Sequence, residues 1–208
     1  MSLPAAYDRP SGDRHFLDRT RPVNTTLAAV DIRRFGTRRD ARTQLLLRRE
    51  MYGLIAEACR ITRVPWSVCY HEDRGDGALF IVPPEVAADH LLDPFASHLN
   101  LVLRRYNRLA GPATRLGLRL AVHTGGVHRD DHGVAGPALV HLFRLLDAPA
   151  FKRFADDTAG DLAMIVSDRM YTDATEGGGL INPDAYVSQR ISCKETRTRG
   201  WIWTPPKH

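Results

Sequence analysis

Two short apolar runs that end in acidic turns most constrain how this chain folds. The first run ends at Asp31 and is followed by a turn. A Gly-Asp-Gly segment, residues 75–77, separates a second apolar run, 66–70, from a third, 78–82. Apolar runs on either side of a Gly-rich turn are typical of a β-hairpin. If the first run lies beside that hairpin in one sheet, Asp31 and Asp76 converge.

Two convergent carboxylates suit a hard cation that prefers oxygen ligands. Mg²⁺ commonly binds one or two carboxylates and takes waters and substrate phosphates as its other ligands. Each residue also has an ordinary interpretation: Asp31 ends a strand, and Asp76 lies in a Gly-rich turn. We therefore base the metal prediction on the pair and its order, and on neither residue alone.

The size and composition predict one globular domain. The chain has 208 residues, of which 43% are hydrophobic and 25% charged. No apolar run approaches the roughly 20 residues of a membrane helix, and the first 20 residues lack the apolar core of a signal peptide. We expect a cytoplasmic protein with an irregular arm over residues 1–22 and a domain over 23–208.

The positive charge is concentrated in the first part of the chain. Residues 1–63 hold 13 Arg against 7 Asp and Glu, whereas the remainder is nearly balanced. Such an excess attracts a triphosphate or a nucleic acid, but it is also typical of a solvated helix face. Three scattered cysteines indicate buried thiols, because their spacing fits neither a disulfide framework nor a metal site.

The patterns along the chain predict a mixed α+β fold. A strand over 25–32 precedes a helix that Asp40 caps and that ends near residue 62. After the hairpin, Pro84 is expected to open a helix that Pro94 interrupts. The second half predicts the elements that follow: a strand over 115–124, a polar loop over 128–133, a helix carrying Arg144, a strand over 161–166, a helix from Ser167, and a hairpin of 187–193 with 201–204.

These motifs together resemble the class III nucleotidyl cyclases. Asp31, Ile32 and Phe35 match the end of that family's first strand, and residues 75–77 match its metal-binding hairpin. The strand 118–127 and the helix 136–145 match its next two motifs. The resemblance implies a ferredoxin-like βααββαβ core with added C-terminal strands.

By this resemblance, the chain converts a nucleoside triphosphate to a 3′,5′-cyclic nucleotide and pyrophosphate. Two Mg²⁺ or Mn²⁺ ions would bind Asp31 and Asp76, assisted by the Ile32 carbonyl. The turn that follows, with Arg34, Phe35 and Gly36, would present backbone N–H groups to the phosphates. The family usually has Gly where this chain has Arg34.

The helix residues implied by the resemblance match only in part. Arg144 matches an arginine that stabilises charge on the α-phosphate in the transition state. Val140 stands where the family has an Asn that positions the ribose. Lys194, near the C-terminus, matches a basic residue that reaches the triphosphate in some relatives.

The residues that would select the base are Glu72 and Asp131. Glu72 can accept hydrogen bonds from the edge of guanine, whereas Asp131 does not fit the guanylyl pattern, so the base stays open.

The resemblance also implies a homodimer with shared active sites and a separate effector or regulatory protein as partner. Two alternatives remain beside the cyclase. The Val140 substitution favours a catalytically inactive nucleotide-binding or dimerising sensor on the same fold. The Arg-rich first part favours a nucleic-acid-binding module, which we rank last.

Overall fold

The computed structural model describes residues 16–17, 19–37 and 40–205. Most of the predicted N-terminal arm, residues 1–15 and 18, lies outside these residues. The described end of the arm contacts the domain, because Leu17 is buried in the core. Among the described residues, no helix combines the length and the apolar character that crossing a membrane requires.

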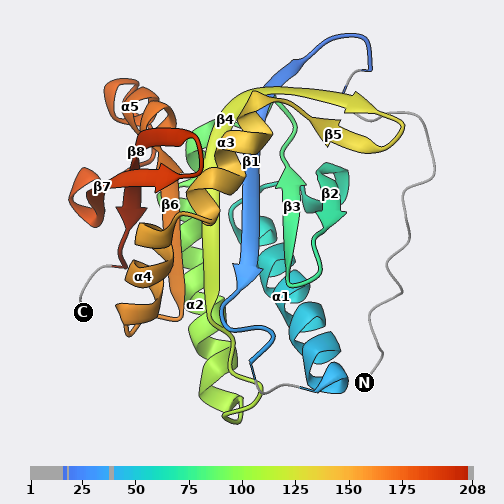
Figure 1. Cartoon of the computed structure of the whole chain (residues 1–208), viewed down its shortest axis with the longest axis vertical. Helices are drawn as coiled ribbons and strands as arrows, with labels where there is room; N and C mark the ends of the chain where they lie inside the picture. Colours follow the sequence, from blue (N-terminus) through green and yellow to red (C-terminus); the bar gives the residue numbers. More distant parts are fainter. Residues whose placement is uncertain (1–15, 18, 38–39, 206–208) are drawn as a thin grey trace.

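One sheet organises the fold, with helices on both of its faces (Figure 1). Its main path runs β2-β3-β1-β4-β6-β8-β7, and β5 pairs with β4. All neighbours pair antiparallel except β4 and β6, which are parallel. The described strands are β1 (Val23–Ile32), β2 (Tyr70–Asp73), β3 (Gly77–Ile81), β4 (Leu118–Asp130), β5 (Gly133–Ala135), β6 (Leu162–Ser167), β7 (Tyr186–Cys193) and β8 (Thr196–Trp203).

Two cores cover the two faces of the sheet. The helices α1 (Ala41–Ile61) and α2 (Asp93–Leu109) pack on one face, where α5 (Asp168–Glu176) adds its apolar side. The helices α3 (Pro137–Leu146) and α4 (Pro149–Asp157) pack on the other face (Figure 1). Alternate buried residues of β1, β3, β4, β6 and β8 enter opposite cores, as the two-residue period of a strand requires.

Local sequence signals explain why two of the helices begin where they do. The Asp40 carboxylate accepts a hydrogen bond from the Thr43 N–H at 2.7 Å, which confirms the predicted cap of α1. Ser167 caps α5 in the same way through the Met170 N–H. Both residues satisfy an N–H group of the first helical turn that has no partner within the helix.

The α+β architecture is as predicted, but several boundaries differ. Residues Trp66–Val68 form a 3₁₀ turn, so the first arm of the hairpin starts only at Tyr70. A single α-helix and this turn connect β1 to β2, where the core pattern has two helices. Pro84 opens no α-helix, and Pro94 lies in the first turn of α2, where its missing N–H costs nothing.

The stretch expected as a polar loop, residues 128–133, is also different. It continues β4 to Asp130 and turns into β5, so it forms a projecting hairpin (Figure 1). Its polar residues are exposed except the half-buried Arg129, and residues 128–130 pair with β5 through their backbone groups. The helix α4 was not predicted, because only nine residues carry it between two loops.

Candidate functional site

Strand pairing brings the two predicted metal carboxylates to one edge of the sheet. Asp31 lies opposite Gly77 in the β1–β3 pair, and the Ile32 N–H donates to the Asp76 carbonyl at 2.9 Å. Gly77 permits this approach, because a Cβ there would lie 2.1 Å from the Val30 carbonyl oxygen. Asp31 and Asp76 are therefore neighbours, as the sequence predicted. Asp31 is buried, whereas Asp76 is exposed to solvent.

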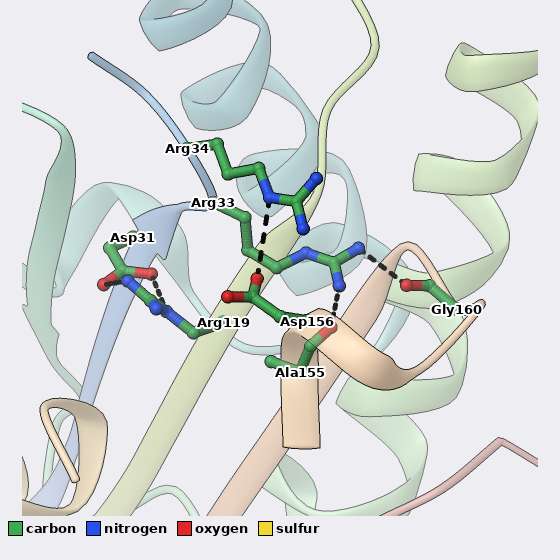
Figure 2. Close-up of polar contacts among 7 residues, drawn as sticks. All are labelled: Asp31, Arg33, Arg34, Arg119, Ala155, Asp156 and Gly160. Atoms are coloured by element: carbon green, nitrogen blue, oxygen red, sulfur yellow. Dashed lines mark hydrogen bonds and ion pairs between the residues drawn. The ribbon is translucent and has the colours of Figure 1, made fainter. Parts of the chain in front are cut away.

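Arg119 of β4 binds the Asp31 carboxylate in a bidentate ion pair (Figure 2). Burial raises the pKa of Asp31 above its ordinary value, although the hydrogen bonds and the charge of Arg119 oppose that effect. The sequence analysis did not select Arg119. The signal was its place one residue into β4, because antiparallel pairing sets it directly opposite Asp31.

The turn after Asp31 contains a residue in the left-handed region. Arg34 has φ +56°, a left-handed conformation that glycine adopts without cost. This is the position where the family usually has glycine, so the arginine adopts the glycine conformation. Phe35 packs partly against the core, and Gly36 is open to solvent.

The Arg33 side chain binds backbone groups at the end of α4. Its guanidinium donates to the Ala155 carbonyl in α4 and, at 2.7 Å, to the Gly160 carbonyl (Figure 2). It passes over Gly117, where a Cβ would lie 2.4 Å from its Nε atom. Arg33 thus joins the turn after β1 to the C-terminal end of α4.

Glu72 and Asp131, the predicted base-selecting residues, have separate partners. Glu72 accepts a hydrogen bond from the Tyr70 hydroxyl at 3.2 Å and pairs with Arg74 at 2.9 Å. Asp131 pairs with Arg19 at 2.6 Å. A Cβ built at Gly133 of β5 would lie 3.6 Å from a Glu72 carboxylate oxygen.

Arg144 lies on α3 and binds Glu195 in the turn between β7 and β8. Its Nε and Nη2 atoms lie 3.1 and 3.0 Å from one Glu195 oxygen. Lys194, in the same turn, is exposed and has φ +50°. Val140 is 48% exposed, one helical turn before Arg144. The chain therefore places Arg144, Lys194 and Val140 together on one surface.

The two groups of predicted residues belong to different parts of the chain. Asp31 lies at the end of β1 and Asp76 in the adjacent β2–β3 turn, whereas Arg144 lies on α3 and Lys194 in the β7–β8 turn. No hydrogen bond or ion pair among the described residues joins one group to the other. The elements that carry them are in contact, because the Arg74 guanidinium of the hairpin lies 4.9 Å from the centroid of the Phe143 ring on α3. A site that needs both groups is completed either within one chain or by a second copy.

The residues at the β1 edge fit a cation that shares its ligands with a substrate. The described part of the chain contains no cluster of three His, Cys, Asp or Glu residues that could hold a metal ion alone. Two adjacent carboxylates match Mg²⁺ or Mn²⁺ when phosphate oxygens and water complete the shell. The donor set therefore fits a metal–nucleotide complex and does not fit a metal site made of protein alone.

Comparison with known proteins identifies the fold. No protein-family model matches the sequence, and no curated protein matches it. The structure is similar to that of the guanylyl cyclase Cya2, with a TM-score of 0.60, 16% identity, and coverage of 88% of this chain and 91% of that one.

Two further solved structures show the same similarity. An adenylate/guanylate cyclase/hydrolase from Silicibacter pomeroyi gives a TM-score of 0.59 at 18% identity, covering 89% of this chain and 99% of that one. The adenylyl cyclase CyaB from P. aeruginosa gives 0.58 at 12% identity, covering 92% and 98%.

Proposed function

We propose that this chain, which has the fold of class III nucleotidyl cyclase domains, converts a nucleoside triphosphate to a 3′,5′-cyclic nucleotide and pyrophosphate. The observation that carries the proposal is the adjacency of Asp31 and Asp76 at the end of β1, with Arg119 beside them. Two carboxylates and a planar guanidinium suit a metal-bound phosphate chain. Similar structures whose names include bound GTP and ATPαS support the choice of substrate class.

Each residue of the site has a role in this proposal. Asp31 and Asp76 hold two Mg²⁺ or Mn²⁺ ions, which would lower the pKa of the attacking 3′-hydroxyl and neutralise charge on the phosphates. The Ile32 carbonyl assists them. The turn with Arg34, Phe35 and Gly36 contacts the phosphates through backbone N–H groups.

Arg119 enters the proposal from the structure. Its Nε and Nη2 atoms donate to Asp31, which leaves the Nη1 N–H groups to donate to phosphate oxygens. We assign to Arg119 the role of neutralising the negative charge of the terminal phosphates.

The remaining residues form the second half of the proposed site. Arg144 acts on the charge that develops at the α-phosphate, and Lys194 contacts the triphosphate. Glu72 and Asp131 are the proposed base contacts. Because Arg144 and Asp31 lie in separate groups, we propose a two-fold homodimer in which each site takes one group from each copy. The names of solved relatives from Blastocladiella emersonii include both dimeric and monomeric forms.

The inactive nucleotide-binding sensor remains the second candidate, because a specific observation favours it. Val140 offers no hydrogen bond to a ribose, and loss of one orienting contact costs on the order of 10²-fold in rate. In either case, a separate effector or regulatory protein would carry the signal.

Support for the nucleic-acid module is weaker than the sequence indicated. Several arginines of the first part bind groups of the protein itself: Arg33 holds α4, Arg48 pairs with Asp73, and Arg49 pairs with Glu50.

The deciding experiment incubates the purified protein with ATP, GTP, CTP or UTP and Mn²⁺ and assays cyclic product and pyrophosphate. A cyclase turns over at least one of them, and Asp76→Asn abolishes that turnover. We choose Asp76 because it is exposed, whereas Asp31→Asn also breaks the buried pair with Arg119. Binding without turnover would favour the sensor, and neither binding nor turnover would refute both.

A further inference from the structure

The helix α4 ends in two acidic residues that work against its own stability. Asp156 and Asp157 occupy its last turn, which contains no basic residue. The C-terminal end of a helix carries partial negative charge, so carboxylates there are unfavourable. Residues that destabilise their own helix or strand are often found at functional sites.

Asp156 lies among the arginines of the β1 edge. Its Oδ1 atom is 3.9 Å from the Arg34 Nε atom, and Figure 2 shows its carboxylate between Arg34 and the pair of Asp31 with Arg119. Burial lowers the pKa of Arg119, but Asp31 and then Asp156 raise it above its ordinary value. Asp156 therefore places a negative charge beside both the exposed Arg34 and the buried Arg119.

The fold holds Asp156 in this place through Arg33. The two hydrogen bonds from Arg33 tie the turn after β1 to the carbonyls of Ala155 and Gly160, which flank Asp156 in the chain. Gly117 leaves the space that the Arg33 side chain needs. The carboxylate is thus kept beside the phosphate turn by contacts that do not involve its own charge.

We propose that Asp156 is a specificity-determining residue at the phosphate end of the site, where it selects against metal-free triphosphate. The inference rests on the proposed function, because it assumes that phosphates bind at this turn. Without ligand, Asp156 supplies the negative charge that faces Arg34. A bound triphosphate supplies the negative charge that faces Arg34, and Asp156 then repels the triphosphate. Coulomb repulsion scales with ligand charge, and one divalent cation removes roughly half of the charge of a triphosphate. The penalty therefore falls mainly on the metal-free form.

The test measures affinity by calorimetry for inorganic tripolyphosphate and for GTP, each with EDTA and each with Mg²⁺. We expect Asp156→Asn to tighten binding of the metal-free ligands about five-fold and of the Mg²⁺ complexes about two-fold at low ionic strength. The gain should shrink in high salt, because salt screens exposed charges.

Asp157→Asn is the matched control. It removes the same charge from the same helical turn, and neither substitution harms the helix, because both relieve an unfavourable charge at its C-terminus. We expect the change in affinity caused by Asp157→Asn to be less than about half of that caused by Asp156→Asn. The reason is that, among the described residues, Asp157 forms no ion pair with the turn.

The outcomes separate the two proposals. In one outcome the wild type binds the ligands, while Asp156→Asn and Asp157→Asn change the affinity equally or not at all. That result would overturn the role of Asp156 and leave the proposed function standing. Equal gains for the metal-free and metal-bound ligands would also overturn the selection. Failure of both the wild type and Asp156→Asn to bind tripolyphosphate, GTP, ATP, CTP or UTP, with or without Mg²⁺, would refute the inference and the proposed function together.

Discussion

Arg119 and Asp31 face each other across the β1–β4 pair and share two hydrogen bonds. The Arg119 Nε donates to Oδ1 at 2.8 Å and Nη2 donates to Oδ2 at 2.7 Å. Only 13% of the Arg119 side chain and 12% of the Asp31 side chain are exposed. Each charge therefore depends on the other for compensation within a largely dry part of the domain.

Removing Arg119 should destabilise the fold even without ligand. Arg119→Ala leaves a buried carboxylate without its partner, so we expect a loss of about 2–4 kcal/mol in the free energy of unfolding, measured with urea. Arg119→Lys keeps the charge but loses the fork, and it should cost less. Arg115→Ala is the control, because that side chain is 59% exposed in its pair with Asp161. Equal losses for Arg119→Ala and Arg115→Ala would contradict the structural role of the pair.

The left-handed conformation of Arg34 predicts an unusual order of substitutions. Arg34→Gly should be more stable than Arg34→Ala by about 1 kcal/mol, since only glycine adopts φ +56° without steric cost. In an ordinary exposed position alanine would be the more stable variant. Thermal unfolding of the two variants decides the point, and a more stable alanine variant would show that the turn is not left-handed in solution.

The clearance above Gly117 can be tested directly. Gly117→Ala places a Cβ within 2.4 Å of the Arg33 Nε atom, so the arginine must leave its carbonyl partners. We expect a loss of about 1–3 kcal/mol in the free energy of unfolding. Gly36→Ala should cost little, because no atom lies within 4 Å of a Cβ there. In an Arg33→Ala background the cost of Gly117→Ala should largely disappear; if it persists, the clash is not with Arg33.

The role of Arg144 predicts a particular kinetic pattern. If the chain turns over a triphosphate, Arg144→Ala should lower kcat by about 10²-fold or more and leave metal-dependent nucleotide binding nearly unchanged, because the charge it stabilises develops in the transition state. Val140→Asn should raise the rate if the missing Asn limits the enzyme. If weaker nucleotide binding accounts for the whole loss of activity in Arg144→Ala, Arg144 acts in ground-state binding and not in the transition state.

A buried histidine should make stability depend on pH. The Nδ1 atom of His123 lies 2.8 Å from the Ser167 hydroxyl, and its ring packs 4.7 Å from that of His141. Burial, and then the charges of His141 and Arg169, lower the pKa of His123 from 6.5 to about 4. Between these two values the unfolded chain binds the proton more tightly, so stability should fall as the pH falls from about 6.5 to about 4.

The effect can be isolated with one variant. His123→Gln cannot take up this proton, so the difference in unfolding free energy between wild type and variant should change by up to about 3 kcal/mol across that pH range. The difference should be constant above about pH 7.5, where both states of the wild type hold a neutral histidine. A difference that stays constant down to pH 4 would show that His123 titrates normally in the folded protein.

Local features of the sequence were sufficient for much of the fold and for half of the site. Asp40 and Ser167 begin their helices because a cap needs only the next three residues. The Gly-rich turn predicted the hairpin, and Asp31 and Asp76 were predicted as neighbours on the condition that the first strand lies beside it, as the resemblance implied. The start of β2 at Tyr70 and the absence of an α-helix at Pro84 were not predicted, since short apolar and Pro-containing stretches fit several conformations.

Only the tertiary structure decided what surrounds these residues. Arg119 meets Asp31 from 88 positions away because β4 pairs with β1 in one particular register. Asp156 comes to Arg34, and Arg33 to the end of α4, because α4 packs on the same face of the sheet toward which the turn points. The sequence by itself determined the residues that can carry charge and the local shape of each turn. The partner of each charge depends on strand order and helix packing, which form from burial of apolar surface across the whole chain.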